Sequence, residues 1–67
     1  MLVTVEYIQR ELNHLRIMAG DDEIAHTYED ALRHKVLAAI ADGARNPAGL
    51  AAEVLKTGDI EFYRWYS

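Results

Sequence analysis

A stretch near the middle of the chain, residues 21–43, carries the markers of a long helix at both of its ends. Asp21, Asp22 and Glu23 open it, and carboxylates there accept hydrogen bonds from the first amides and suit the positive end of the helix dipole. Gly43 closes it, because a residue without a Cβ adopts a left-handed cap at little cost. The sequence therefore predicts one central helix over residues 21–43, with the other segments packed against it.

The central helix has two distinct sides in its first half only. At about 100° per residue, an apolar stripe forms on one side and a polar, solvated face on the other. The stripe comprises Ile24, Ala25, Tyr28, Leu32, Val36 and Ala39, and the polar face comprises Asp22, His26, Glu29, Asp30 and Arg33. Residues 36–41 (VLAAIA) are apolar on every side, so we expect them to be covered from more than one direction.

A first helix is predicted before the central one. Thr4 is a suitable N-cap, and the helix is expected to end between Met18 and Gly20. Its apolar face repeats at helical spacing through Val5, Ile8, Leu12 and Leu15. The link at Gly20 is short, which predicts that the first two helices form an antiparallel hairpin.

A short third helix and an aromatic tail follow. Asn46 as N-cap and Pro47 at the first helical position predict a helix from residue 47 to about 56, closed by Gly58. The tail, residues 59–67 (DIEFYRWYS), is rich in aromatic residues, which disordered ends lack. We expect it to lie across the apolar second half of the central helix. The side chains expected to complete the core are Ile60, Phe62 and Trp65.

The predicted fold is all-α: a single domain over residues 1–67 with two long antiparallel helices, a short third helix and the tail on the central helix. A chain of this length buries only about 60% of its unfolded surface. There are no cysteines to supplement the core. The alternative is a helical hairpin that dimerises into a four-helix bundle.

The composition argues against two functional classes, nucleic-acid binders and membrane proteins. The net charge of −4 repels phosphate backbones and argues against a nucleic-acid binder. No apolar run approaches the roughly 20 residues that span a membrane, and no basic region followed by an apolar one opens the chain. The sequence predicts a soluble, cytoplasmic protein without a membrane contact.

Four strings along the chain carry a resemblance. They are DDEIAH at residues 21–26, Glu29 with Asp30, LAAIADG at residues 37–43 and TGDIEF-x-RWY at residues 57–66. In this order they resemble a group of small uncharacterised proteins of actinobacteria and their bacteriophages. The resemblance implies a protein that binds a host or phage protein, and it implies no particular chemistry.

Two Glu-x-x-His pairs are the candidates for metal binding. Glu11 with His14 and Glu23 with His26 each place a carboxylate and an imidazole on adjacent helical turns, where the two can share a metal. Both pairs are expected on polar helix faces, away from the core where bundle metal sites are built. We therefore expect no cofactor and no stabilisation by metal ions, and keep a metal-binding helical protein as the alternative function.

Catalysis is not indicated. The chain has no glycine-rich phosphate loop, no H-E-x-x-H motif and no Ser-His-Asp order. Asp30 with His26 or His34 could act as an acid and base, but an exposed helix face lacks the pocket that would orient a substrate. The sequence predicts a protein that is not an enzyme.

The leading functional prediction is a small interaction module that acts through a partner protein or through its own copy. Aromatic residues and arginine dominate protein interfaces, so the expected partner contacts are Tyr63, Arg64 and Tyr66. The second half of the central helix is apolar on every side, which favours a homodimer. The residues expected at its two-fold contact are Val36, Leu37 and Ile40.

Overall fold

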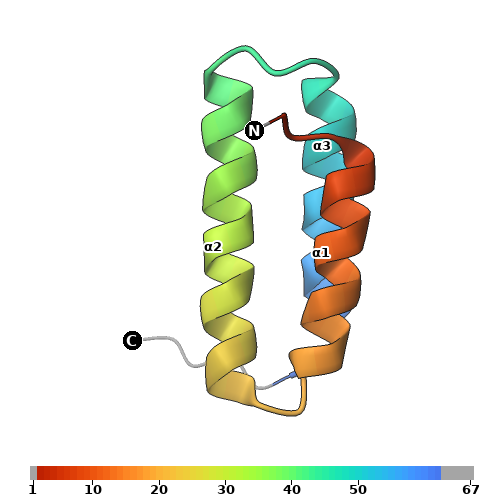
Figure 1. Ribbon diagram of the computed structural model, residues 1–67, viewed down its shortest axis with the longest axis vertical. Coiled ribbons are helices and arrows are strands. Elements are labelled where there is room, and N and C mark those ends of the chain that lie inside the picture. The colour runs from red at the N-terminus through yellow and green to blue at the C-terminus, as the bar shows by residue number, and fades with distance from the viewer. Residues whose placement is uncertain (1, 63–67) are drawn as a thin grey trace.

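Helices account for most of the structure, a computed structural model that describes residues 2–62 of the 67-residue chain. They are α1 (Val5–Met18), α2 (Asp22–Ala41), α3 (Pro47–Val54) and, directly after α3, the 3-10 helix η1 (Leu55–Asp59). α1 and α2 run antiparallel, and α3 packs against both (Figure 1). The prediction of an all-α fold with three mutually packed helices is confirmed, and the described residues contain no strand.

Each of the three α-helices begins at the residue that the sequence marks as its N-cap. A side-chain oxygen accepts a hydrogen bond from the backbone amide three residues later, which satisfies one of the free amides of the first turn. These bonds join Thr4 to Tyr7 (3.1 Å), Asp21 to Ile24 (3.2 Å) and Asn46 to Gly49 (3.3 Å).

The C-terminal ends of the helices agree less closely with the predictions. α2 ends at Ala41, and Gly43 has the predicted left-handed conformation, with a φ of 90°. The third helix was expected to stop near residue 56 before Gly58, but the chain continues through Gly58 as η1. A tertiary contact explains the difference: the guanidinium of Arg33 on α2 binds the buried side chain of Thr57 at 2.9 Å, which holds the tighter 3-10 turn against α2.

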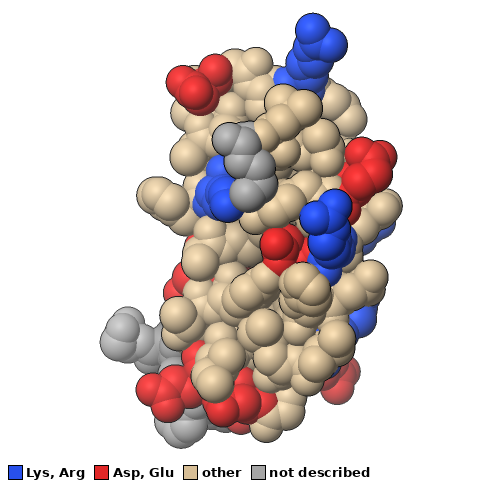
Figure 2. Space-filling view, viewed as in Figure 1, with Lys and Arg blue, Asp and Glu red and all other residues tan. Residues whose placement is uncertain are grey.

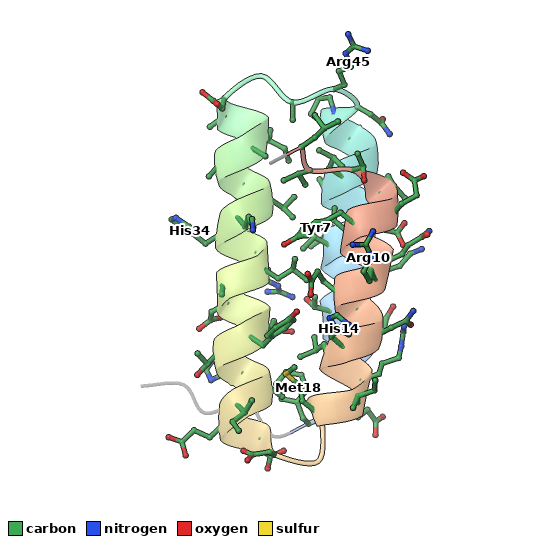
Figure 3. The ribbon with its side chains drawn as sticks, viewed as in Figure 1. Tyr7, Arg10, His14, Met18, His34 and Arg45 are labelled. Carbon is green, nitrogen blue, oxygen red and sulfur yellow. The ribbon has the colours of Figure 1, made fainter. Side chains whose placement is uncertain are left out.

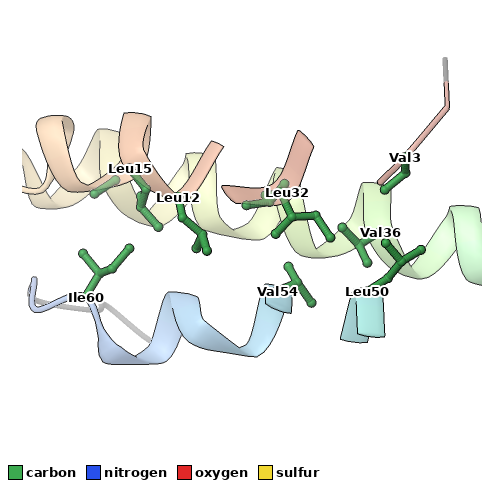
Figure 4. Close-up of a cluster of buried hydrophobic side chains, with 10 residues drawn as sticks. Val3, Leu12, Leu15, Leu32, Val36, Leu50, Val54 and Ile60 are labelled. Carbon is green, nitrogen blue, oxygen red and sulfur yellow. The ribbon is translucent and has the colours of Figure 1, made fainter. Parts of the chain in front are cut away.

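The core is one apolar cluster to which every helix or its flanking segment contributes (Figure 4). It is made of Val3, Ile8, Leu12, Leu15, Ala25, Leu32, Val36, Leu50, Val54 and Ile60. Val3 lies with Val36 and Leu50 at one end of the cluster, while Ile60 lies near Leu15 at the other end. The segments before α1 and after η1 therefore close the two ends of the core.

Among residues 2–62 of a single chain, only the inner side of the second half of α2 is covered, and the expected cover from several directions is not present there. Val36 is fully buried, but Leu37 is 63% exposed, and Ala38 and Ala41 are exposed as well. Val3, with helix α3, supplies the cover that was assigned to the tail. One short helix and one extended segment reach only the inner side of α2.

Two residues of α2 differ in burial from what was predicted. Ile24 was placed in the core stripe but is 55% exposed, because it lies about 100° around the helix from the buried Ala25 and Leu32. Glu29 was placed on the solvated face but is only 3% exposed. It lies on the side of α2 where Arg33 binds η1, and that packing covers it.

The described part of the tail packs at the far end of the bundle. Ile60 is buried and Phe62 is half-buried against the core cluster. Both therefore help to complete the core, as predicted. However, Ile60 lies near Leu15, not across the second half of α2. The prediction for Trp65 concerns a residue outside the described range.

Candidate functional site

Three polar side chains meet where α1 and α2 face each other. Tyr28 of α2 reaches across to α1, and its hydroxyl donates a hydrogen bond to Oε2 of Glu11. The same carboxylate oxygen lies 3.1 Å from Nδ1 of His14, one helical turn further along α1. The Tyr28 hydroxyl lies 3.5 Å from that imidazole nitrogen. We refer to these three residues as the Glu11 cluster.

The Glu11 cluster is sheltered on one side and open on the other. The Glu11 side chain is 16% exposed and the His14 side chain 51%, while Tyr28 is half-buried. The carboxylate is thus largely removed from water and held by its two neighbours. The imidazole is the most exposed of the three and forms the outer side of the cluster.

A shallow pocket of about 150 Å³ adjoins the cluster in the groove between α1 and α2. Its lining, which we call the α1–α2 groove, is Tyr7, Glu11, Tyr28, Ala31, Leu32 and Lys35. Tyr7 extends from α1 toward α2 (Figure 3), and the Lys35 ammonium lies 5.3 Å from the centre of its ring. This cation–π contact closes the groove above the Glu11 cluster.

Two further hollows continue the groove along α2. One, of about 390 Å³, shares Tyr28 and Ala31 with the groove and adds Glu23, Ile24 and Thr27. The other, of about 560 Å³, shares Lys35 with it and is lined further by Val3, Ala38, Ala39, Ala41 and Asp42. Figure 2 shows broad uncharged surface on this side of the molecule, with acidic side chains gathered at the end where α1 turns into α2. A long, mainly apolar track therefore borders α2.

A second polar network lies on the other side of α2 and holds η1 in place. Arg33 donates through Nε to the buried hydroxyl of Thr57, and its Nη2 lies 3.8 Å from Oε2 of Glu29. Glu29 and Arg33 thus form an i, i+4 pair, but its carboxylate is inside the protein. We interpret this network as structural, because its side chains are occupied in joining two elements.

The four metal candidates are not brought together in one place. Glu11 and His14 meet in the Glu11 cluster, whereas Nε2 of His26 lies 3.4 Å from Oδ2 of Asp30, and Glu23 lines the hollow beside Ile24. Within residues 2–62, no three or more His, Asp and Glu side chains are grouped so as to hold a metal ion. The third donor beside Glu11 and His14 is a phenol.

The self-association candidates differ in exposure. Val36 is buried in the core of a single chain, Ile40 is half-buried and Leu37 is largely exposed. The three candidates for partner binding in the tail, Tyr63, Arg64 and Tyr66, lie outside the described residues.

Sequence reasoning missed the part that Tyr28, Tyr7 and Lys35 play in this site. Tyr28 is 17 residues from Glu11, so no spacing within one helix could relate them. The predicted hairpin could have related the two residues, because Glu11 and Tyr28 lie at nearly equal distances in sequence before and after the turn at Gly20. In an antiparallel pair of helices, such positions face each other.

No protein-family model, curated protein or solved structure matches this chain. None of the helices described between residues 2 and 62 combines the length and the apolarity needed to cross a membrane.

Proposed function

We propose that this chain is a small non-enzymatic module that binds another protein along α2, beside the α1–α2 groove. The observation that supports it most is the run of three adjoining hollows along one helix. Their lining is mainly aliphatic and aromatic, and apolar surface of that kind on a small domain marks contacts with other chains. Ile24, at 55% exposure, borders one end of the run.

The shape of the track suits an amphipathic helix. Such a helix lays its apolar face into a groove between two helices and anchors at every third or fourth residue. The start of α2 carries Asp21, Asp22 and Glu23, so a partner helix with basic residues at that end is favoured electrostatically. The net charge of −4 favours a basic partner over an acidic one.

We propose a host or phage protein as the partner, because the sequence resembles small proteins of actinobacteria and their bacteriophages. Tyr63, Arg64 and Tyr66 remain proposed additional contacts, on the strength of their residue types. No catalytic role is proposed, since the pockets along α2 are shallow and open.

A second copy of the chain is the other candidate partner, and the exposure of Leu37 favours it. The contact would involve Leu37 and Ile40 near a two-fold axis, where each copy presents the same patch to the other. Val36 would support that patch from inside the core and not touch the partner.

Site-specific photocrosslinking in the native cell tests the proposal. A photoreactive residue in place of Ala31, in the groove, should yield one defined adduct. The same residue in place of Ala52, which is exposed on α3, is the matched control and should yield none. Adding Ile24→Arg should remove the Ala31 adduct, because a charge in the hollow opposes burial. Identical adduct patterns from both positions would contradict the proposal.

A further inference from the structure

We infer that the partner helix binds antiparallel to α2, with an acidic residue against Lys35 and basic residues against the start of α2. This direction and charge order rest on the partner-binding role proposed above. The supporting observation is the order in which charged side chains border the three hollows along α2. From the end of α2 toward its start, these are Asp42, then Lys35, then Glu11 and Glu23.

Lys35 is the positive position in this order. Among the described residues that line the three hollows, it alone is basic. Its ammonium lies 5.3 Å from the centre of the Tyr7 ring, and no carboxylate within residues 2–62 forms an ion pair with it. A side chain already held over an aromatic ring loses little conformational freedom when it pairs with a carboxylate. An acidic residue of the partner is therefore favoured here.

The half of the groove toward the turn between α1 and α2 is negative. Glu23 lines the hollow at the start of α2 and follows Asp21 and Asp22 in the sequence. Glu11 lines the middle hollow at the level of Tyr28, from which it accepts a hydrogen bond. Figure 2 shows acidic side chains gathered at this end of the molecule. Basic residues of the partner are favoured against this half.

The positive and negative positions are far enough apart to distinguish the two directions of a partner helix. Glu23 and Lys35 are separated by 12 positions on α2 (35 − 23), which is about 18 Å in a helix that rises about 1.5 Å per residue. A partner helix that meets both therefore has its acidic and its basic residues more than three turns apart.

The helix dipoles favour the antiparallel direction. α2 runs from Asp22 to Ala41, so its positive end lies beside Glu23 and its negative end beside Asp42. A partner whose N-terminus lies over Asp42 brings its own positive end to that carboxylate. Its acidic residue then falls in its first half and its basic residues in its last turns, which also suits its own dipole. The parallel direction reverses each of these relations.

Two synthetic helices test the charge order. Both have leucines at every third or fourth position, and both carry a hydrocarbon staple on the outward side so that they are equally helical. One has glutamates in its first half and lysines in its second half, and the other has the reverse order. We expect the glutamate-first peptide to bind the full chain at least about tenfold more tightly, measured by fluorescence anisotropy.

Two variants of equal charge separate recognition from a structural role. Lys35→Glu should weaken binding of the glutamate-first peptide about tenfold and strengthen binding of the lysine-first peptide, because repulsion and attraction are exchanged. Arg45→Glu changes the net charge equally, but the Arg45 side chain extends beyond the end of the bundle (Figure 3). It should bind both peptides as the parent does. A variant that merely unfolds loses both peptides, so it cannot produce the exchange of preference.

A benzophenone at either end of the glutamate-first peptide reports the direction. At the N-terminus it should crosslink to residues near Asp42, and at the C-terminus to residues near Glu23, as located by mass spectrometry. The opposite pattern overturns the inference, as does equal binding of the two peptides or binding of neither. If these tests fail while the Ala31 adduct still forms in cells, the partner-binding role stands without this direction. Absence of the Ala31 adduct means that the partner-binding role itself fails.

Discussion

The buried hydroxyl of Thr57 helps to hold η1 against α2. It is fully buried, it accepts a hydrogen bond from Arg33, and it lies in the 3-10 turn that the sequence did not predict. A buried polar group is tolerated when it is hydrogen-bonded, and its partner here comes from a helix 24 residues earlier in the chain. The position of η1 against α2 therefore depends on a tertiary contact.

Thr57→Val keeps the shape of the side chain and removes the acceptor. We expect the free energy of unfolding to fall by about 1 kcal/mol, since Arg33 loses a partner but part of its guanidinium stays in contact with water. Thr27→Val is the control, because Thr27 is exposed and bonds only within its own helix. Urea unfolding of both variants measures the difference; equal stability of the two would show that the bond to Arg33 contributes nothing.

The same limit on sequence reasoning applies to the sides of α2. Helical periodicity correctly placed Ala25, Leu32 and Val36 in the core. It misplaced Glu29 and Ile24, because the boundary of a buried stripe depends on where neighbouring elements pack. A carboxylate beside an arginine also matches a solvated pair, so Glu29 gave no local sign that η1 would cover it.

At the scale of elements, α3 is the helix that depends most on its neighbours. Its eight residues are too few for a stable isolated helix, so its packing must hold it in place. Its start was predictable, since the cap of Asn46 and the proline after it act within the helix. Its continuation as η1 was not, since that depends on Arg33 of α2.

Leu50→Ala tests this dependence. Leu50 is almost completely buried between α3 and the rest of the core, so we expect a loss of about 2–5 kcal/mol and partial or complete unfolding. Leu55→Ala provides the comparison, because Leu55 is 67% exposed and its truncation should change stability by less than about 0.5 kcal/mol. Far-ultraviolet circular dichroism during thermal unfolding reports both. A Leu50→Ala protein as stable as Leu55→Ala would mean that α3 is not part of the cooperative core.

For the whole molecule, composition and the three capped helices were enough to predict an all-α bundle with an antiparallel first pair. They did not predict which segment covers the second half of α2. Val3 does so, although its short apolar lead has no periodicity to mark it. Two members of the Glu11 cluster, Glu11 and His14, were recognisable in the sequence as a Glu-x-x-His pair. The third member, Tyr28, could be found only from the geometry of the hairpin.

The proposed contact between two copies makes a prediction at this scale. Light scattering across a dilution series should show the mass rising from that of the 7.6 kDa chain toward twice that value as concentration increases. Leu37→Asp should stay at the single-chain mass, because dimerisation would bury its carboxylate.

Leu55→Asp is the matched control and should assemble as the parent does. Dilute samples of the parent and of Leu37→Asp should melt alike, since Leu37 is mainly exposed in one chain, while concentrated parent should melt higher. A parent that stays monomeric at all concentrations would remove the second copy from the list of partners.

The short turns that join the three helices also bear on how fast this protein forms. Each helix packs directly against the next one along the chain, so most contacts join residues that are close in sequence. Little chain entropy is lost in closing such short loops, and helical proteins of this kind fold within microseconds to milliseconds. The contacts of Val3 with Leu50 and of Ile60 with Leu15 span the longer stretches of chain among the core residues labelled in Figure 4. Their formation is therefore expected to be the late, slow step, after the hairpin of α1 and α2 has already closed.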